Sequence, residues 1–230
     1  MTSINAWVTR VRNTKAYDIF VALPLMALFG LGAWRESWNI LVHVRAIAGG
    51  TENLLGVLQM LAFIGSVVFS LLIIVMLLLR TLPRARAPGV LPRALAVMGT
   101  VLALGFLYLR PAVLPVWAQA TVDVMIFGAS VLEIIILLRL GKAFAIMAEA
   151  RELVTSGPYA VVRHPLYVAE EIGILTMFIQ FAGPVALALM LAHIAVQVAR
   201  TVYEERVLTA VFPEYRAYKA RTWRFIPHVV

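Results

Sequence analysis

Residues 54–79 read LLGVLQMLAFIGSVVFSLLIIVMLLL, and no residue in this run is charged. A helix needs about 20 apolar residues to cross the hydrocarbon core of a bilayer, so the run predicts a membrane-spanning helix. The whole chain of 230 residues is 62% hydrophobic and 14% charged, whereas soluble domains average about 45–50% apolar and about 25% charged residues. With a mean hydropathy of +0.91, the sequence predicts a polytopic membrane protein. This composition excludes a disordered chain, a coiled coil and an ordinary water-soluble enzyme.

Five further apolar runs predict membrane-spanning helices, and those at residues 94–109, 166–182 and 184–200 are short. The five runs cover residues 17–34, 94–109, 120–138, 166–182 and 184–200. Gly183 and Pro184 separate the last two runs, and this turn signal predicts a tight helical hairpin. The expected fold class is therefore an all-α integral membrane protein with about six transmembrane helices, including a C-terminal hairpin.

The placement of the basic residues predicts the topology. The chain has 20 Lys and Arg residues against 12 Asp and Glu residues, and cytoplasmic segments of membrane proteins are enriched in Lys and Arg. If the N-terminus is cytoplasmic, every basic residue except Arg35, Arg45 and Arg110 lies on the cytoplasmic side. We therefore expect both termini in the cytoplasm. The abundance of Ala and Arg favours a bacterial source, hence an inner-membrane protein whose site faces the cytoplasm.

Metal and thiol chemistry are not expected. The chain contains no cysteine, which excludes disulfides, thiolate metal sites and a cysteine nucleophile. Its four histidines, His43, His164, His193 and His228, are widely separated in the sequence. We expect no metal site and no nucleic-acid partner.

Two polar stretches interrupt the apolar pattern on the same predicted side, and the first covers residues 139–171. Gly157 and Pro158 predict a turn, because proline presets φ and glycine supplies conformational freedom. Pro165 disfavours helical geometry at His164 but suits the first turn of the helix that follows. His164 would then lie at a helix N-terminus, whose free N–H groups favour an anion. A well-formed loop with an arginine among the lipid headgroups is the alternative.

The second polar stretch covers residues 200–228 and follows the last predicted span. A polar stripe leads into it, because four side chains are spaced by four, three and four residues: His193, Gln197, Arg200 and Glu204. Ionisable groups at membrane depth are costly and usually face a partner or a water-filled cavity. Glu205 points about 100° away from Glu204, so one could face a ligand while the other pairs with an arginine. This pattern favours a binding site over a snorkelling helix end.

These motifs resemble the isoprenylcysteine carboxyl methyltransferase family, which belongs with the integral-membrane phospholipid methyltransferases. The matching motifs are GPYxxxRHPLY over residues 157–167, the pair Glu204–Glu205, and FxxYxxY over residues 212–218. Residues 140–146 are also similar to the segment that precedes this loop in many members. The resemblance covers about residues 139–228, and the motifs follow one another in order on one membrane face.

The resemblance implies an S-adenosylmethionine-dependent methyltransferase with a lipophilic acceptor that enters from the bilayer, an isoprenylcysteine carboxylate or a lipid headgroup. It implies that the cofactor lies against Tyr159, His164, Pro165, Leu166, Tyr167, Glu204, Glu205, Tyr215 and Tyr218. The residues that it places in catalysis are Arg163, Arg200 and Glu204. Near the acceptor we expect Glu170, Glu171, His193 and Gln197. Residues 1–110 would then be additional transmembrane helices, and residues 111–230 the methyltransferase core.

The sequence departs from the family pattern at two places. Many members have a glycine soon after the loop tyrosine, where this chain has VAEE over residues 168–171. The tail reads FPEY over residues 212–215 where FGEEY is common, which leaves the roles of Glu204 and Glu205 interchangeable. Methyl transfer to a carboxylate needs little acid–base help, whereas a protonated amine acceptor would need a base.

Two other function classes compete with the methyltransferase. A transporter or channel could use a route through Asp123, Glu133, Glu170, Glu171 and His193. Against it, the polar residues concentrate near the cytoplasmic side and the sequence has no inverted repeat. A membrane reductase that uses a nicotinamide cofactor would also suit six short spans, but the sequence has no glycine-rich dinucleotide fingerprint. The sequence leaves the acceptor and the oligomeric state open.

Overall fold

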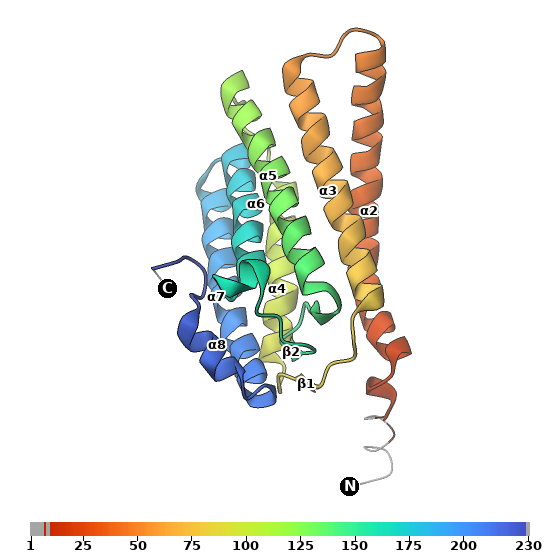
Figure 1. Cartoon of the computed structure of the whole chain (residues 1–230). Helices are drawn as coiled ribbons and strands as arrows, with labels where there is room; N and C mark the ends of the chain where they lie inside the picture. Colours follow the sequence, from red (N-terminus) through yellow and green to blue (C-terminus); the bar gives the residue numbers. More distant parts are fainter. Residues whose placement is uncertain (1–6, 8–9, 229–230) are drawn as a thin grey trace.

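The computed structural model describes residue 7 and residues 10–228. The described part is a bundle of helices (Figure 1), in which five helices are long and apolar enough to cross a membrane. They are α2 (Lys15–Ala48), α3 (Leu54–Leu79), α4 (Leu91–Gly105) continued by the short helix η1 (Phe106–Tyr108), α5 (Val116–Leu140) and α7 (Pro184–Val211). The predicted all-α membrane fold is confirmed.

The remaining predicted span, residues 166–182, corresponds to helix α6 (Pro165–Phe181), which has 17 residues and lies at the lower end of the range for a membrane-spanning helix. The chain turns from α6 into α7 at Gly183, whose carbonyl accepts a hydrogen bond from Leu187 N at 2.9 Å. Helices α6 and α7 lie side by side (Figure 1) and form the predicted C-terminal hairpin.

Two helices are longer than the apolar runs that predicted them. Helix α2 continues past the predicted end at residue 34 to Ala48, and α7 continues past residue 200 to Val211. Charged side chains interrupt an apolar run without breaking a helix, because Arg and Glu are themselves good helix formers. Helix α2 ends where Gly50 adopts a φ of +69°, and α7 ends just before Pro213.

The helices pack in an order that differs from their order in the chain. Helix α2 packs on α3, α3 on α5, α5 on α6 and α6 on α7, whereas α4 packs on α7. Helix α4 belongs to the expected N-terminal part, residues 1–110, yet it covers a helix of the part formed by residues 111–230. The functional division at residue 110 stays a prediction.

One end of the bundle carries short elements that position the site. Strand β1 (Ala85–Arg86) pairs with strand β2 (Glu149–Ala150) in an antiparallel ribbon. The short helices η2 (Gly141–Ala143) and η3 (Gly157–Ala160) belong to the α5–α6 connection. Helix α8 (Tyr215–Arg221), both strands and the start of α2 lie at this same end (Figure 1). Its orientation toward the cytoplasm stays a prediction.

A buried cluster joins these short elements to the bundle. It consists of Ala87, Ala148, Ala150, Val207, Phe212, Tyr215 and Tyr218. Because its members come from both sides of the ribbon, from α7 and from α8, the burial of this cluster holds the α5–α6 connection and the C-terminal segment against the end of α7.

Candidate active site

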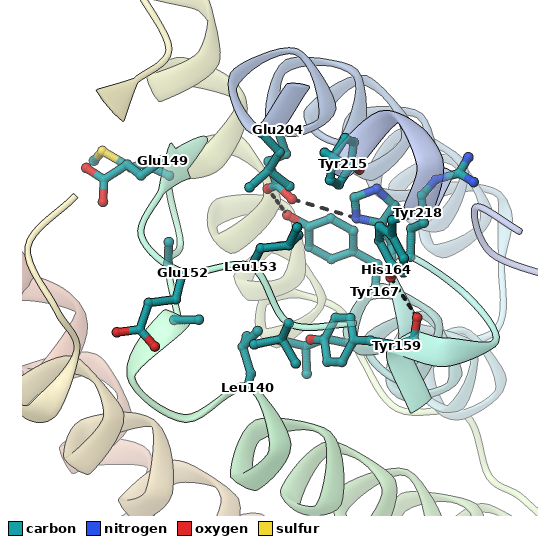
Figure 2. A pocket seen from close by; sticks show the side chains of 17 residues that line it. Leu140, Glu149, Glu152, Leu153, Tyr159, His164, Tyr167, Glu204, Tyr215 and Tyr218 are labelled. Atoms are coloured by element: carbon teal, nitrogen blue, oxygen red, sulfur yellow. Dashed lines mark hydrogen bonds and ion pairs between the residues drawn. The ribbon is translucent and has the colours of Figure 1, made fainter. Parts of the chain in front are cut away.

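An open cavity lies at this end of the bundle, between the α5–α6 connection, the starts of α6 and α8, and the last turns of α7. Figure 2 shows the side chains that line it. Those labelled there are Leu140, Glu149, Glu152, Leu153, Tyr159, His164, Tyr167, Glu204, Tyr215 and Tyr218. Residues that are far apart in the sequence therefore meet in one place, as the two polar stretches predict.

The loop before α6 has the geometry that its sequence predicts. Gly157 adopts a φ of +65°, a backbone conformation that favours glycine, and a Cβ at this position would lie 3.2 Å from Arg139 Cγ. His164 has non-helical angles, φ −125° and ψ 55°, and Pro165 begins helix α6. The predicted turn and the predicted helix start are both present.

The C-terminal segment is hydrogen-bonded to this loop along the backbone. Arg163 N donates to Trp223 O at 2.7 Å, His164 N donates to Arg224 O at 3.1 Å, and Trp223 N donates to Val161 O at 3.2 Å. The segment therefore lies beside the loop like an added strand, and the tail closes one side of the cavity.

Glu205 is the buried anchor of this arrangement and is 3% exposed. Its carboxylate accepts hydrogen bonds from Arg163 Nε at 3.0 Å and Arg224 Nε at 3.1 Å. It also pairs with Lys219 Nζ at 2.6 Å and His164 Nε2 at 3.3 Å. With these partners, Glu205 takes the arginine-paired role that the sequence left open between the two glutamates.

Glu204 lines the cavity, whereas Glu205 is not among the lining residues. The Tyr167 hydroxyl donates a hydrogen bond to Glu204 Oε1, and His164 Nδ1 lies 3.8 Å from Glu204 Oε2 (Figure 2). The rings of His164 and Tyr167 are stacked, with their centroids 5.6 Å apart. Two of the predicted cofactor-binding side chains, His164 and Tyr167, thus meet at the carboxylate of a third, Glu204.

Three further tyrosines form an aromatic wall. The Tyr218 hydroxyl donates to Tyr159 O at 2.7 Å, and the rings of Tyr215 and Tyr218 pack edge to face. Burial raises the pKa of Tyr218 to about 12 and raises the pKa of Tyr159 further, so both remain neutral at physiological pH. In the described part of the chain, the buried Tyr215 hydroxyl has no hydrogen-bond partner.

A second polar group lies behind Tyr167, deeper in the helical bundle. The Arg200 guanidinium stacks over the Tyr167 ring, 4.9 Å from its centroid, and donates to Gln197 Oε1 at 2.6 Å. Gln197 Nε2 in turn donates to Glu170 Oε2 at 2.5 Å. Arg200 and Gln197 also face Gly99 of α4, where a Cβ would lie 3.1 Å from Arg200 Nη1.

The other two residues predicted near the acceptor form a pair of their own. His193 Nδ1 pairs with Glu171 Oε1 at 2.8 Å, which joins α7 to α6. Asp123, which the transport alternative placed on its route, accepts a hydrogen bond from Gln119 Nε2 at 3.1 Å near the start of α5. The four residues predicted near the acceptor therefore divide into two pairs, His193 with Glu171 and Gln197 with Glu170, and the second pair belongs to the Arg200 group.

Sequence reasoning missed a buried ion cluster next to the cavity. Asp18 of α2 pairs with Arg80 Nε and with Arg151 Nη2, both at 2.8 Å. Arg151 Nη2 also pairs with Glu149 Oε2 at 2.6 Å, and Glu149 Oε1 pairs with Arg86 Nε at 3.1 Å. This cluster connects α2 and the end of α3 to the loop that carries Glu149 and Glu152. The density of acids between residues 149 and 152 was the only signal in the sequence.

Within the described residues, no group of three or more His, Asp or Glu side chains could hold a metal ion. The fold and the cavity instead define a multi-pass membrane protein with an acidic and aromatic pocket at one end of its bundle. Residues 119–215 match the family model described as phospholipid methyltransferase. Over this segment the chain is similar to that family of membrane methyltransferases, and the resemblance predicted from the motifs is confirmed.

Two curated relatives match shorter segments. The chain is 45% identical over 80 residues to the cobalt-zinc-cadmium resistance protein CzcN of Cupriavidus metallidurans, which covers 34% of this chain and 36% of that protein. It is 41% identical over 86 residues to the nickel-cobalt-cadmium resistance protein NccN of Alcaligenes xylosoxydans xylosoxydans, which covers 35% and 38%. The chain therefore spans little more than a third of the length of these relatives.

Proposed function

We propose that this protein transfers a methyl group from S-adenosylmethionine to a lipophilic acceptor at the membrane surface. The observation that carries the proposal is Glu204, whose carboxylate is held in the cavity by Tyr167 beside the stacked His164 ring. The family match supports methyl transfer in general. The basic residues at this end of the bundle favour a cytoplasmic orientation in a bacterial inner membrane.

The cavity fits this cofactor chemically. S-adenosylmethionine is a cation with an ammonium, ribose hydroxyls and an adenine, and when bound it supplies the methyl group on a sulfonium. Glu204 offers a carboxylate for the ammonium or the ribose, and the faces of Tyr159 and Tyr218 can receive a cation or a base. The unpaired hydroxyl of Tyr215 offers a further hydrogen bond, which offsets the cost of leaving it buried alone.

The residues around the cavity would act by positioning and by excluding water. Glu205 fixes Arg163 and His164 of the loop and Arg224 of the tail on one carboxylate, so the loop and tail keep one geometry. Correct placement of donor and acceptor can supply most of the rate in such a displacement. The hydrogen bonds between loop and tail restrict the entry of water on this side.

The group behind Tyr167 supports a place for the acceptor. Arg200 carries a positive charge that would attract a carboxylate or phosphate. Its guanidinium is held by Gln197, which is itself hydrogen-bonded to Glu170. We place the reactive end of the acceptor between this group and the cavity, with its apolar part among the helices. The roles of His193 and Glu171 in acceptor binding belong to the same proposal.

Calorimetry of S-adenosylhomocysteine binding to the purified protein in detergent tests the cofactor site. We expect Glu204→Gln and His164→Ala to weaken binding roughly 10- to 100-fold, as expected for one charge-assisted contact of about 1.5–3 kcal/mol. Glu52→Gln and His43→Ala are matched controls, because they also change a glutamate and a histidine that pair with each other. His43 Nδ1 of α2 lies 2.7 Å from Glu52 Oε2 in the α2–α3 connection. Binding that stays equal in all four variants, or no binding to the folded protein, would refute the proposal.

A role in heavy-metal resistance is a second proposal, because both curated relatives carry such a role in their names. Growth of a deletion strain on cobalt, nickel or cadmium tests it. If methyl transfer produces the resistance, complementation should fail with Glu204→Gln and succeed with Glu52→Gln. Equal complementation by both variants would separate metal resistance from this cavity and favour transport.

A further inference from the structure

A second cavity lies on the outer side of α7, between α7, α8 and the C-terminal segment. The residues that define its character are Val202, Arg206, Thr209, Arg216, Lys219 and Arg224. None of these six lines the candidate cofactor cavity. We call this second cavity the α7–α8 groove.

The α7–α8 groove carries an excess of positive charge. Four of its lining residues are Arg or Lys, and the only acid among them is Glu205. Glu205 already binds Lys219 and Arg224 as well as the loop arginine, Arg163. Arg206 and Arg216 form no ion pair within the described residues. Like charges that gather without counter-charges create a field that attracts an anion.

An exposed apolar stripe on α7 leads to the groove. Its members are Leu187, Leu191, Ile194 and Val198, which are between 39% and 55% exposed. They are spaced by four, three and four residues, so they lie on one face of the helix. Val202 and Thr209 continue this face into the groove. In a bilayer, such a stripe contacts acyl chains, and the cations at its end lie where a headgroup would be.

We propose that the α7–α8 groove binds the phosphate of an anionic phospholipid whose acyl chains lie along the apolar stripe. Free phosphate shares the headgroup chemistry, but only a lipid makes use of the stripe as well. The site is independent of the proposed methyl transfer. It is nevertheless joined to the candidate active site through Lys219 and Arg224, because both also bind Glu205.

Native mass spectrometry of the detergent-solubilised protein, titrated with phosphatidylglycerol or phosphatidylcholine, tests this proposal. We expect one phosphatidylglycerol molecule to bind with clear preference over phosphatidylcholine. The double variant Arg206→Gln/Arg216→Gln should weaken that binding roughly 30-fold, from about 1 kcal/mol for each cation removed. Neither arginine binds Glu205, so the contacts between loop and tail stay intact. Arg93→Gln/Arg221→Gln is the matched control, because both arginines are exposed and neither lines the groove.

Two further arms distinguish the sources of the phosphate. At constant ionic strength, inorganic phosphate should not displace the bound lipid. Leu191→Gln should weaken the binding of the lipid but not the binding of phosphate. Equal lipid binding by the two double variants would overturn the proposal. The proposal would also be overturned if phosphate bound as tightly as the lipid and Leu191→Gln changed neither affinity, since the groove would then be a site for a soluble anion. Thermal unfolding of each variant establishes that it is folded.

Discussion

Replacement of Asp18 by asparagine should strongly destabilise the protein, although Asp18 lies outside the candidate active site. Its carboxylate is 4% exposed and compensates two buried guanidiniums, those of Arg80 and Arg151. Removing one partner from a buried ion pair costs about 3–5 kcal/mol, because a charge is left without compensation. For a chain of this size, each kcal/mol lowers Tm by about 2–4 °C, so we expect a decrease of roughly 6–20 °C.

The geometry also predicts how a second change should act. Arg151→Met would leave two balanced pairs, Asp18 with Arg80 and Glu149 with Arg86. It should therefore cost less than Asp18→Asn, apart from the lost hydrogen bond from Arg151 to Thr81 O. The double variant Asp18→Asn/Arg151→Met should be more stable than Asp18→Asn alone, because one uncompensated cation is gone.

Thermal unfolding in detergent, followed by intrinsic tryptophan fluorescence, measures all of these variants. Glu214→Gln provides a matched control, since it removes an exposed acid and should change stability by less than about 0.5 kcal/mol. Two results would refute this prediction: additive effects of Asp18→Asn and Arg151→Met on stability, or a decrease in Tm of less than about 2 °C for Asp18→Asn. The cluster would then not act as one electrostatic unit.

Two further predictions concern the site itself. Gly99→Ala should shift the Arg200 guanidinium, because the added Cβ would lie 3.1 Å from Nη1. Steady-state kinetics should then show a raised KM for the acceptor and an unchanged KM for the methyl donor. Equal changes in both KM values would contradict a role confined to the acceptor. Glu205→Gln should detach the tail from the loop, because Arg163, Lys219 and Arg224 would all lose their counter-charge. In limited proteolysis, the variant should be cleaved after these basic residues much faster than the native protein. An unchanged cleavage pattern would contradict the anchoring role of Glu205.

The apolar pattern of the sequence was sufficient to predict the bundle but not the ends of its helices. The run 54–79 coincides with α3, because this helix begins and ends where its apolar composition does. Helix α2 shows the limit of the method. Its residues 35–48 include charged side chains, which end the apolar run at residue 34. The helix itself continues, because these side chains are unfavourable in the bilayer core but compatible with a helix.

The candidate site shows a similar limit. Helical geometry separates Glu204 from Glu205 by about 100°, which predicts that their roles differ. It does not say which of them faces the cavity, because that depends on where the tail returns. Lys219 and Arg224 settle the matter by binding Glu205 from α8 and from the segment beyond it. Likewise, Asp18 and Arg151 are 133 residues apart, and no local spacing rule connects them.

Contacts from outside the matched segment suggest how the first helices take part in the site. Arg151 pairs with Asp18 of α2, and Arg200 faces Gly99 of α4, where a Cβ would lie 3.1 Å from Nη1. The first contact supports the loop beside the proposed cofactor site, and the second borders the group behind Tyr167, where we propose that the acceptor binds. Neither Asp18 nor Gly99 lies in residues 119–215, which match the family. Under the proposed function, two chains that share this segment but differ in α4 would hold the methyl donor alike and could select different acceptors.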